Sequence, residues 1–269
     1  MTLSERPIGI FDSGLGGLTV VKAVLEHMPN ENIIYLGDSL NVPYGEKTSG
    51  QITEFVFKNT EFLLRHGVKA VAIACNTADA TSRGKLMQCY SLPIIGVISP
   101  ASHKAAELTK NKKVGVIATS TAVNSGAYER TIKSYLSDCQ VFSVPAPKLV
   151  PLVEAGKIHK EDTEMLEALE EYLNPLKAKG IDTLILGCTH YPLVFELVKD
   201  MMPDINIVSS GSSSLGSLRE KLRKEGLLNT SGKKGEAQFF VTGEPSYFEK
   251  NGGLFLGTSI EGKVQRAVI

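Results

Sequence analysis

The chain has 269 residues, of which 42% are hydrophobic and 22% charged, and its 29 basic side chains balance its 29 acidic ones. This balance excludes a global charge field of the kind that attracts nucleic acid or an anionic membrane. The N-terminus has no basic segment followed by an apolar one, and no apolar run approaches the roughly 18 residues that span a bilayer. We therefore expect a cytoplasmic globular protein with no membrane contact and no direct nucleic-acid binding.

Short apolar runs alternate with amphipathic segments along the chain. Most runs are continuous in Val, Ile and Leu, which is typical of strands buried in a parallel sheet. The predicted strands are Pro7–Phe11, Asn32–Leu36, Lys69–Ala74, Pro93–Ile98, Lys113–Ala118, Gln140–Val144, Thr183–Gly187, Ile205–Val208 and Ala237–Val241. Such alternation predicts βαβ units with right-handed crossovers.

Three of the intervening segments predict helices with recognisable ends. Leu18–Met28 follows a Gly-rich turn, Thr48–His66 ends at Gly67, and Lys160–Lys179 ends at Gly180. Near the C-terminus, the Ser/Gly-rich segment 209–217 reads as a connection and the Asn-Gly-Gly at 251–253 as a turn.

Two segments resemble each other. Residues 66–77 and 179–190 both read as a helix end, a Gly, a short buried strand, a Cys at the strand tip and a polar pair. A weaker pair, Ile8–Phe11 and Val114–Ile117, lies at a similar separation. The repeat predicts two related α/β halves, each with a cysteine at the carboxyl end of a strand.

The four cysteines, at 75, 89, 139 and 188, are widely spaced and contain no C-x-x-C pair, so neither a disulfide framework nor a structural zinc site is expected. Ligands of open α/β sheets bind beyond the carboxyl ends of the strands, where Cys75 and Cys188 lie. A helix start after each would lower the thiol pKa and favour an anionic ligand. We expect Cys75 and Cys188 to react with alkylating agents before Cys89 and Cys139, which are expected only to pack.

The residues that follow the two thiols add hydrogen-bonding groups. Asn76 and Thr77 follow Cys75, and Thr189 and His190 follow Cys188, so a carboxylate ligand would suit this edge. An extended backbone would place His190 on the same face as Cys188, within reach for proton exchange. Reading Cys188 and His190 as zinc ligands requires a third ligand, and no motif supplies one.

Two further segments lie at predicted strand tips. Asp12 with Ser13 ends the first strand in a Gly-rich turn, where the carboxylate serves equally well as a turn cap or as part of a ligand cleft. Tyr44 and Gly45 lie in the polar loop after the second strand, a position that often binds substrate.

Together these residues resemble a known family. The segments Ile10–Leu18, Tyr35–Asp38, Pro43–Gly45, Ala74–Ala78 and Leu186–Leu193 are similar to those of the glutamate racemases, and the resemblance spans nearly the whole chain. It implies two pseudo-symmetric doubly wound parallel-sheet α/β domains that face a central cleft, formed by residues 1–98 with 209–269 and by residues 99–208. It further implies chemistry without a cofactor or metal, glutamate as the substrate, a homodimer, and the supply of D-glutamate for peptidoglycan.

The resemblance also implies residue roles. Cys75 and Cys188 match the two acid/base thiols, Asp12 the acid assisting the first, and Glu154 with His190 the pair assisting the second. The substrate-binding positions are Asp12, Ser13, Tyr44, Gly45, Asn76, Thr77, Thr189 and His190. Ser99, Ala101 and Ser209 depart from the family pattern and bear on loop geometry and domain contacts.

Racemisation requires removing the α-proton from one face of the substrate and returning a proton to the other, which two opposed acid/base groups achieve.

Two alternatives remain open from the sequence. One is a related racemase acting on aspartate or another small amino acid, which pocket length would distinguish. The other is a small-anion binding protein with the same cleft and no turnover, although binding alone needs no paired thiols. Some members of the family also bind DNA gyrase, and the neutral net charge of this chain neither supports nor excludes such binding.

Overall fold

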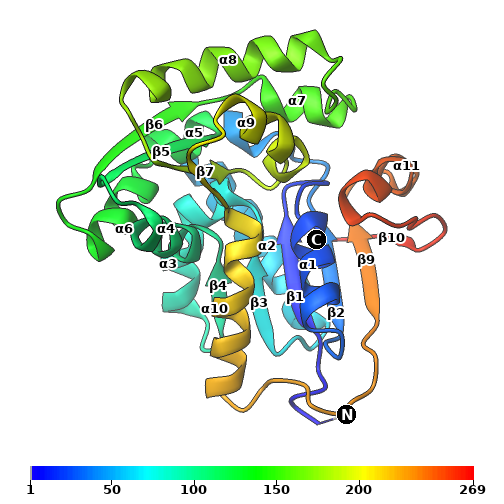
Figure 1. Ribbon diagram of the computed structural model, residues 1–269. Helices are drawn as coiled ribbons and strands as arrows, with labels where there is room; N and C mark the ends of the chain where they lie inside the picture. Colours follow the sequence, from blue (N-terminus) through cyan, green and yellow to red (C-terminus); the bar gives the residue numbers. More distant parts are fainter. Residues whose placement is uncertain (1) are drawn as a thin grey trace.

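The computed structural model describes residues 2–269 and contains two parallel sheets (Figure 1). The larger sheet has the strand order β10–β9–β2–β1–β3–β4, and the smaller has the order β6–β5–β7–β8. The strands are β1 (Ile8–Asp12), β2 (Ile33–Gly37), β3 (Ala70–Ile73), β4 (Ile94–Gly96), β5 (Lys113–Ala118), β6 (Gln140–Pro145), β7 (Thr183–Gly187), β8 (Asn206–Ser209), β9 (Ala237–Val241) and β10 (Val264–Arg266). The predicted fold class, two parallel-sheet α/β halves, is confirmed.

The two halves repeat one topology. The order β2–β1–β3–β4 in the larger sheet corresponds to β6–β5–β7–β8 in the smaller, and every one of these pairings is parallel. The strands β3 and β7, which precede the two cysteines of interest, therefore occupy equivalent places. The repeat read from residues 66–77 and 179–190 is thus a repeat of structure as well as of sequence.

Helices cover the faces of both sheets. They are α1 (Leu18–His27), α2 (Ser49–Arg65), α3 (Asn76–Cys89), α4 (Ile98–Leu108), α5 (Ser120–Asn124), α6 (Ala127–Tyr135), α7 (Leu149–Glu154), α8 (Thr163–Ala178), α9 (Phe195–Met201), α10 (Ser210–Lys224) and α11 (Pro245–Leu256), with the short 3-10 helices η1 (Tyr44–Glu46) and η2 (Tyr191–Val194). The three predicted helices correspond to α1, α2 and α8. Gly67 and Gly180, which follow two of them, adopt the left-handed conformation that ends a helix.

Burial of the central strands fixes the positions of their tips. Every residue of β1, β3 and β7 is buried, as the continuous apolar runs predicted. Each fully buried Val, Leu or Ile side chain contributes about 1.5–3 kcal/mol. The strand ends that carry candidate site residues are therefore held by the most strongly buried part of each half.

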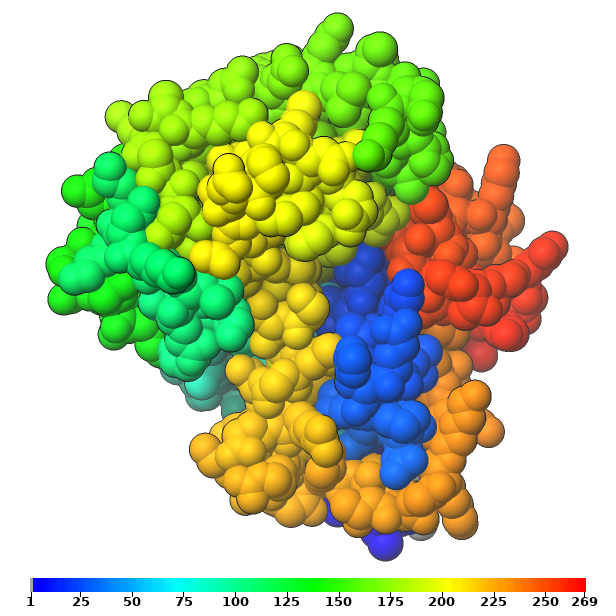
Figure 2. Space-filling model, viewed as in Figure 1, coloured from blue at the N-terminus to red at the C-terminus, as the bar shows by residue number. Residues whose placement is uncertain are grey.

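Two helices connect the halves. The chain leaves the larger sheet through α4 and returns from β8 through α10, which packs against both α4 and α1. In Figure 2 the gold residues, the colour of α10, run down from the green and yellow residues and lie beside the blue N-terminal residues.

The prediction of two irregular segments near the C-terminus is wrong, because both segments lie mainly in helices. Residues 210–217 form the first part of α10, and Ser209 ends β8 and caps the helix. The hydroxyls of Ser212 and Ser213 donate to the carbonyl of Ser209, at the start of this helix. Residues 251–253 lie inside α11. A Cβ on Gly252 would come within 2.5 Å of Ile260 Cδ1, so this glycine serves close packing and not a turn. Also missed was the short strand β10.

No helix among the described residues is both long and apolar enough to cross a membrane.

Candidate active site

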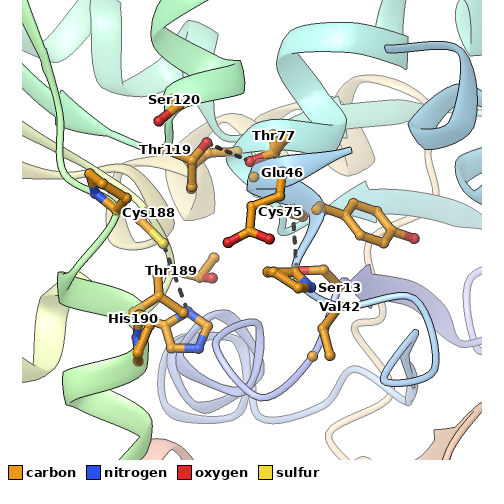
Figure 3. Close-up of a pocket in the computed structure, with 18 of the residues that line it drawn as sticks. Ser13, Val42, Glu46, Cys75, Thr77, Thr119, Ser120, Cys188, Thr189 and His190 are labelled. Atoms are coloured by element: carbon orange, nitrogen blue, oxygen red, sulfur yellow. Dashed lines mark hydrogen bonds between the residues drawn. The ribbon is translucent and has the colours of Figure 1, made fainter. Parts of the chain in front are cut away.

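A cavity of about 270 Å³ lies where strand tips of the two sheets meet. This is the expected place for a ligand in parallel α/β sheets. The cavity is lined by Ser13, Gly14, Val42, Pro43, Tyr44, Gly45, Glu46, Cys75, Asn76, Thr77, Thr119, Ser120, Ala146, Pro147, Val150, Pro151, Glu154, Cys188, Thr189 and His190. Except for Asp12, every predicted site residue lines it. Figure 3 shows Cys75 and Cys188 entering from different sides.

Cys75 lies at the N-terminal cap of α3 and is buried. Its Sγ is 3.6 Å from Ser13 Oγ, to which the thiol donates. Burial, and next the nearby negative charge of Asp12, raise the pKa of Cys75 to about 12. The expectation that a helix start would lower this pKa is therefore wrong, because desolvation of the thiolate outweighs the helix dipole. Without a ligand, this thiol is protonated at neutral pH.

Asp12 lies behind Cys75 and does not line the cavity. Its Oδ2 accepts hydrogen bonds from the backbone N–H groups of Gly14 and Gly17, both at 3.0 Å, so it holds the turn after β1. Its Oδ1 is buried and has no hydrogen-bond partner among residues 2–269. Burial raises the pKa of Asp12, and the positive charge of His190 opposes that rise. The charge of Asp12 thus affects the pKa of Cys75, and its hydrogen bonds hold the turn after β1.

Cys188 has a different environment. Its Sγ is 3.8 Å from His190 Nδ1, and His190 Nε2 is 2.9 Å from Oε1 of Glu154 at the end of α7. Burial lowers the pKa of His190, but the hydrogen bonds to Cys188 and Glu154 outweigh it and raise the pKa to about 10. The imidazole is therefore a cation at neutral pH, placed between a thiol and a carboxylate.

The backbone around Cys188 differs from the prediction in two ways. His190 has helical angles, φ −80° and ψ −31°, so a turn and not an extended chain brings it to Cys188. No α-helix starts directly after Cys188, because the 3-10 helix η2 intervenes before α9.

The polar residues beside the thiols mostly bridge the two halves. Thr77 Oγ1 is 2.8 Å from Thr119 Oγ1, and Thr121 Oγ1 donates to the carbonyl of Gly45 at 2.8 Å. The hydroxyl of Tyr44 donates to Asp38 at 2.5 Å. Tyr44 therefore uses its hydroxyl to fix its own loop, and this loop contacts the opposite half through Gly45.

Sequence reasoning missed several lining residues, among them Thr119, Ser120 and Glu46. A signal for the first two existed: the similarity of Ile8–Phe11 to Val114–Ile117 aligns Thr119 with Ser13. Glu46 directly follows the Tyr44–Gly45 pair, but nothing in its local sequence distinguishes it from a solvated acid. Figure 3 shows its carboxylate turned toward the space between the two thiols.

The other two cysteines lie outside the cavity. Cys139 is buried, as expected, whereas Cys89 is exposed, so the expectation that it packs is wrong. No group of three or more His, Cys, Asp or Glu side chains among residues 2–269 is arranged to hold a metal ion.

Fold and cavity together define a class of protein: a two-half parallel α/β enzyme whose cleft presents one thiol from each half. Residues 18–226 match the family model described as Asp/Glu/Hydantoin racemase. A glutamate racemase of Neisseria meningitidis is 45% identical over 258 residues, which is 96% of this chain and 95% of the relative.

Solved structures of glutamate racemases are similar to this chain as well. The glutamate racemase isoform RacE1 from Bacillus anthracis has a TM-score of 0.93 at 36% identity, covering 99% of this chain and 98% of that one. The glutamate racemase from Francisella tularensis, solved with D-glutamate, has a TM-score of 0.91 at 35% identity, covering 98% of each chain. The chain belongs to the glutamate racemases of the Asp/Glu racemase family, and it is an isomerase acting on amino acids.

Proposed function

We propose that this protein interconverts L- and D-glutamate by proton transfer between Cys75, Cys188 and the two faces of the substrate α-carbon. The observation that carries the proposal is one buried thiol from each half in a single cavity, at equivalent strand tips. The structure with bound D-glutamate of the Francisella relative supports the same substrate here.

In each turnover the substrate α-carbon loses one proton and gains another. The thiolate on one side takes the α-proton, so the Cα–H bond breaks and an S–H bond forms. The thiol on the other side then gives its proton to the opposite face of the carbanion and becomes the thiolate. No electrons are gained or lost overall. Proton transfer by positioned groups is worth typically about 10²–10⁴-fold in rate.

We assign the supporting residues by the same resemblance. Asp12 assists Cys75, and Glu154 with His190 assists Cys188; the contacts from Cys188 through His190 to Glu154 support the second assignment. The proposed substrate-binding residues are Asp12, Ser13, Tyr44, Gly45, Asn76, Thr77, Thr189 and His190. Their backbone N–H groups and hydroxyls suit the two carboxylates of glutamate.

The wider setting is proposed on the family resemblance. We propose that the enzyme works without cofactor or metal as a cytoplasmic homodimer and supplies D-glutamate for peptidoglycan. Its domains would be residues 1–98 with 209–269 and residues 99–208, a division that the two sheets support.

Incubation with L-glutamate and, separately, L-aspartate in deuterated water tests the proposal. We expect loss of the circular dichroism of L-glutamate, with deuterium at the α-carbon of the D-glutamate formed, and a much lower kcat/KM for aspartate. A comparable kcat/KM for aspartate would overturn the substrate assignment. Full activity after dialysis against a chelator is expected, and loss of activity restored by added metal would contradict the metal-free chemistry.

A further inference from the structure

Tyr128, the second residue of α6, lies outside the cavity lining but contacts the residue next to Cys75. Its side chain is 2% exposed, and its hydroxyl accepts a hydrogen bond of 2.6 Å from Nδ2 of Asn76. Asn76 belongs to the half of the larger sheet and Tyr128 to the half of the smaller one. This buried hydrogen bond therefore joins the two halves directly behind the cavity.

A third residue completes the contact. Ser210, the first residue of α10, donates from Oγ to Oδ1 of Asn76 at 3.3 Å, and it is fully buried. Both ends of the Asn76 amide are thus held, one by Tyr128 and one by Ser210. The Asn76–Tyr128–Ser210 cluster brings together the N-terminal turns of α3, α6 and α10.

The same tyrosine also reaches the strand that carries the second thiol. A Cβ on Gly187 would lie 3.0 Å from the Tyr128 hydroxyl oxygen and 2.9 Å from the carbonyl oxygen of Ile117. The absence of a side chain at Gly187 permits this close approach. Gly187 immediately precedes Cys188, just as Asn76 immediately follows Cys75. One hydroxyl group is therefore adjacent to both thiol-bearing strand tips.

We infer that Tyr128 is a positioning residue that sets the placement of Cys75 relative to Cys188 by holding Asn76 from one half against Gly187 from the other. The inference rests on the proposed two-thiol function. Tyr128 lies outside the cavity lining, and it acts through Asn76 and through the chain at Gly187. Because misplacement of a reacting group by about 1 Å can cost about 10²-fold in rate, loss of one such contact is expected to slow proton delivery.

Slow proton delivery by the second thiol changes where deuterium is incorporated, whereas a loss of folded enzyme does not. When the second thiol reprotonates late, the carbanion persists and the first thiol exchanges its proton with the solvent. In deuterated water it then returns deuterium to the original face. The ratio of deuterium in recovered substrate to deuterium in product therefore reports thiol placement, and it does not depend on the amount of active enzyme.

The experiment measures this ratio, together with kcat and KM in both directions, for Tyr128→Phe, which keeps the ring and removes the hydroxyl. We expect a fall in kcat of about tenfold and a several-fold rise in deuterium retained by the substrate. Ser210→Ala, which removes the other contact to Asn76, should move both quantities in the same direction by less. It also provides a second test if Tyr128→Phe folds poorly.

Tyr172→Phe is the matched control. It removes another buried tyrosine hydroxyl, on α8, which has no hydrogen-bond partner among residues 2–269, and it should leave the ratio unchanged. An unchanged ratio in both Tyr128→Phe and Ser210→Ala would overturn the inference. Parallel measurement of Cys75→Ala separates the two proposals. Full racemisation by that variant would refute the two-thiol function, whereas an inactive Cys75→Ala beside an unchanged ratio in both Tyr128→Phe and Ser210→Ala would refute only the positioning role.

Discussion

The two halves share one strand order but place their charged groups differently. In the first half the acid, Asp12, ends β1, and Thr77 lies two residues after the thiol. In the second half the acid, Glu154, comes from α7, and His190 lies two residues after the thiol. The result is a thiol near a buried carboxylate on one side and a thiol beside an imidazolium on the other.

This difference suits a reaction in which one thiol must be protonated while the other accepts a proton. A raised pKa of about 12 keeps Cys75 protonated, whereas Cys188 lies beside the imidazolium of His190. The repeated fold places the two thiols at equivalent strand tips, and their unequal surroundings distinguish one thiol from the other. Racemisation itself hides the asymmetry: since enantiomers are equally stable in water, kcat/KM must be equal in both directions.

A one-way reaction exposes the difference. With a leaving group on the β-carbon of the substrate, the base removes the α-proton, the electrons of the broken bond form a Cα=Cβ bond, and the leaving group departs with its bonding electrons. This elimination needs deprotonation on one face only. The predictions below use it to compare the two sides.

The largest effect is expected from removing either thiol. Cys75→Ala and Cys188→Ala should each lose racemisation by about 10³-fold or more, because the proton donor or acceptor on one face is gone. Each variant should still eliminate from one enantiomer of the β-substituted analogue, and the two should prefer opposite enantiomers. Chiral chromatography of the remaining analogue shows which enantiomer each variant consumes and so checks this prediction. A shared preference would mean that the thiols do not lie on opposite faces.

His190→Gln should affect the two sides unequally. Elimination from the enantiomer that Cys188 deprotonates should fall by about 10²-fold, because the cation beside that thiol is lost. Elimination from the other enantiomer should fall much less. Initial rates with each enantiomer measure the ratio, and an equal fall with both would show that His190 supports the whole cleft and not one thiol.

The residues that the sequence predicted and those it missed differ in a physical way. Cys75 and Cys188 were predictable because buried strands, a repeat and parallel-sheet topology fix where a strand tip lies. The protonation of Cys75 was not, because it depends on how completely the folded chain excludes water. The pairing of Glu154 with His190 joins positions 36 residues apart, so only the resemblance, and no local pattern, indicated it. The helical serines at 210–217 were missed because their hydroxyls bond to carbonyls in and at the start of α10, which composition does not reveal.

Elimination by Cys75 should change by about tenfold per pH unit. In Cys188→Ala the base is Cys75, whose pKa is about 12, so its thiolate fraction and the rate should rise through the whole range from pH 7 to 9. In Cys75→Ala the base is Cys188. Its neighbour His190 keeps its positive charge over this range because the pKa of His190 is about 10, so loss of that cation should not lower the rate there. Stopped assays in overlapping buffers measure both profiles. A rate in Cys188→Ala that does not rise between pH 7 and 9 would contradict the buried surroundings of Cys75 described above.

The smallest effect is expected from Glu154→Gln, at about tenfold or less, because Glu154 acts through His190 and its side chain is 30% exposed against 6% for the histidine. The sign follows from the pKa. The hydrogen bond to Glu154 helps to raise the pKa of His190, so its loss lowers that pKa while burial continues to oppose the charged form. At pH 6 His190 stays largely protonated and elimination by Cys188 should be near normal, whereas at pH 8 to 9 it should fall. Elimination by Cys75 should be unaffected over the same range. A pH-independent loss with both enantiomers would instead mean that Glu154 holds α7 in place, and that the carboxylate does not act through His190.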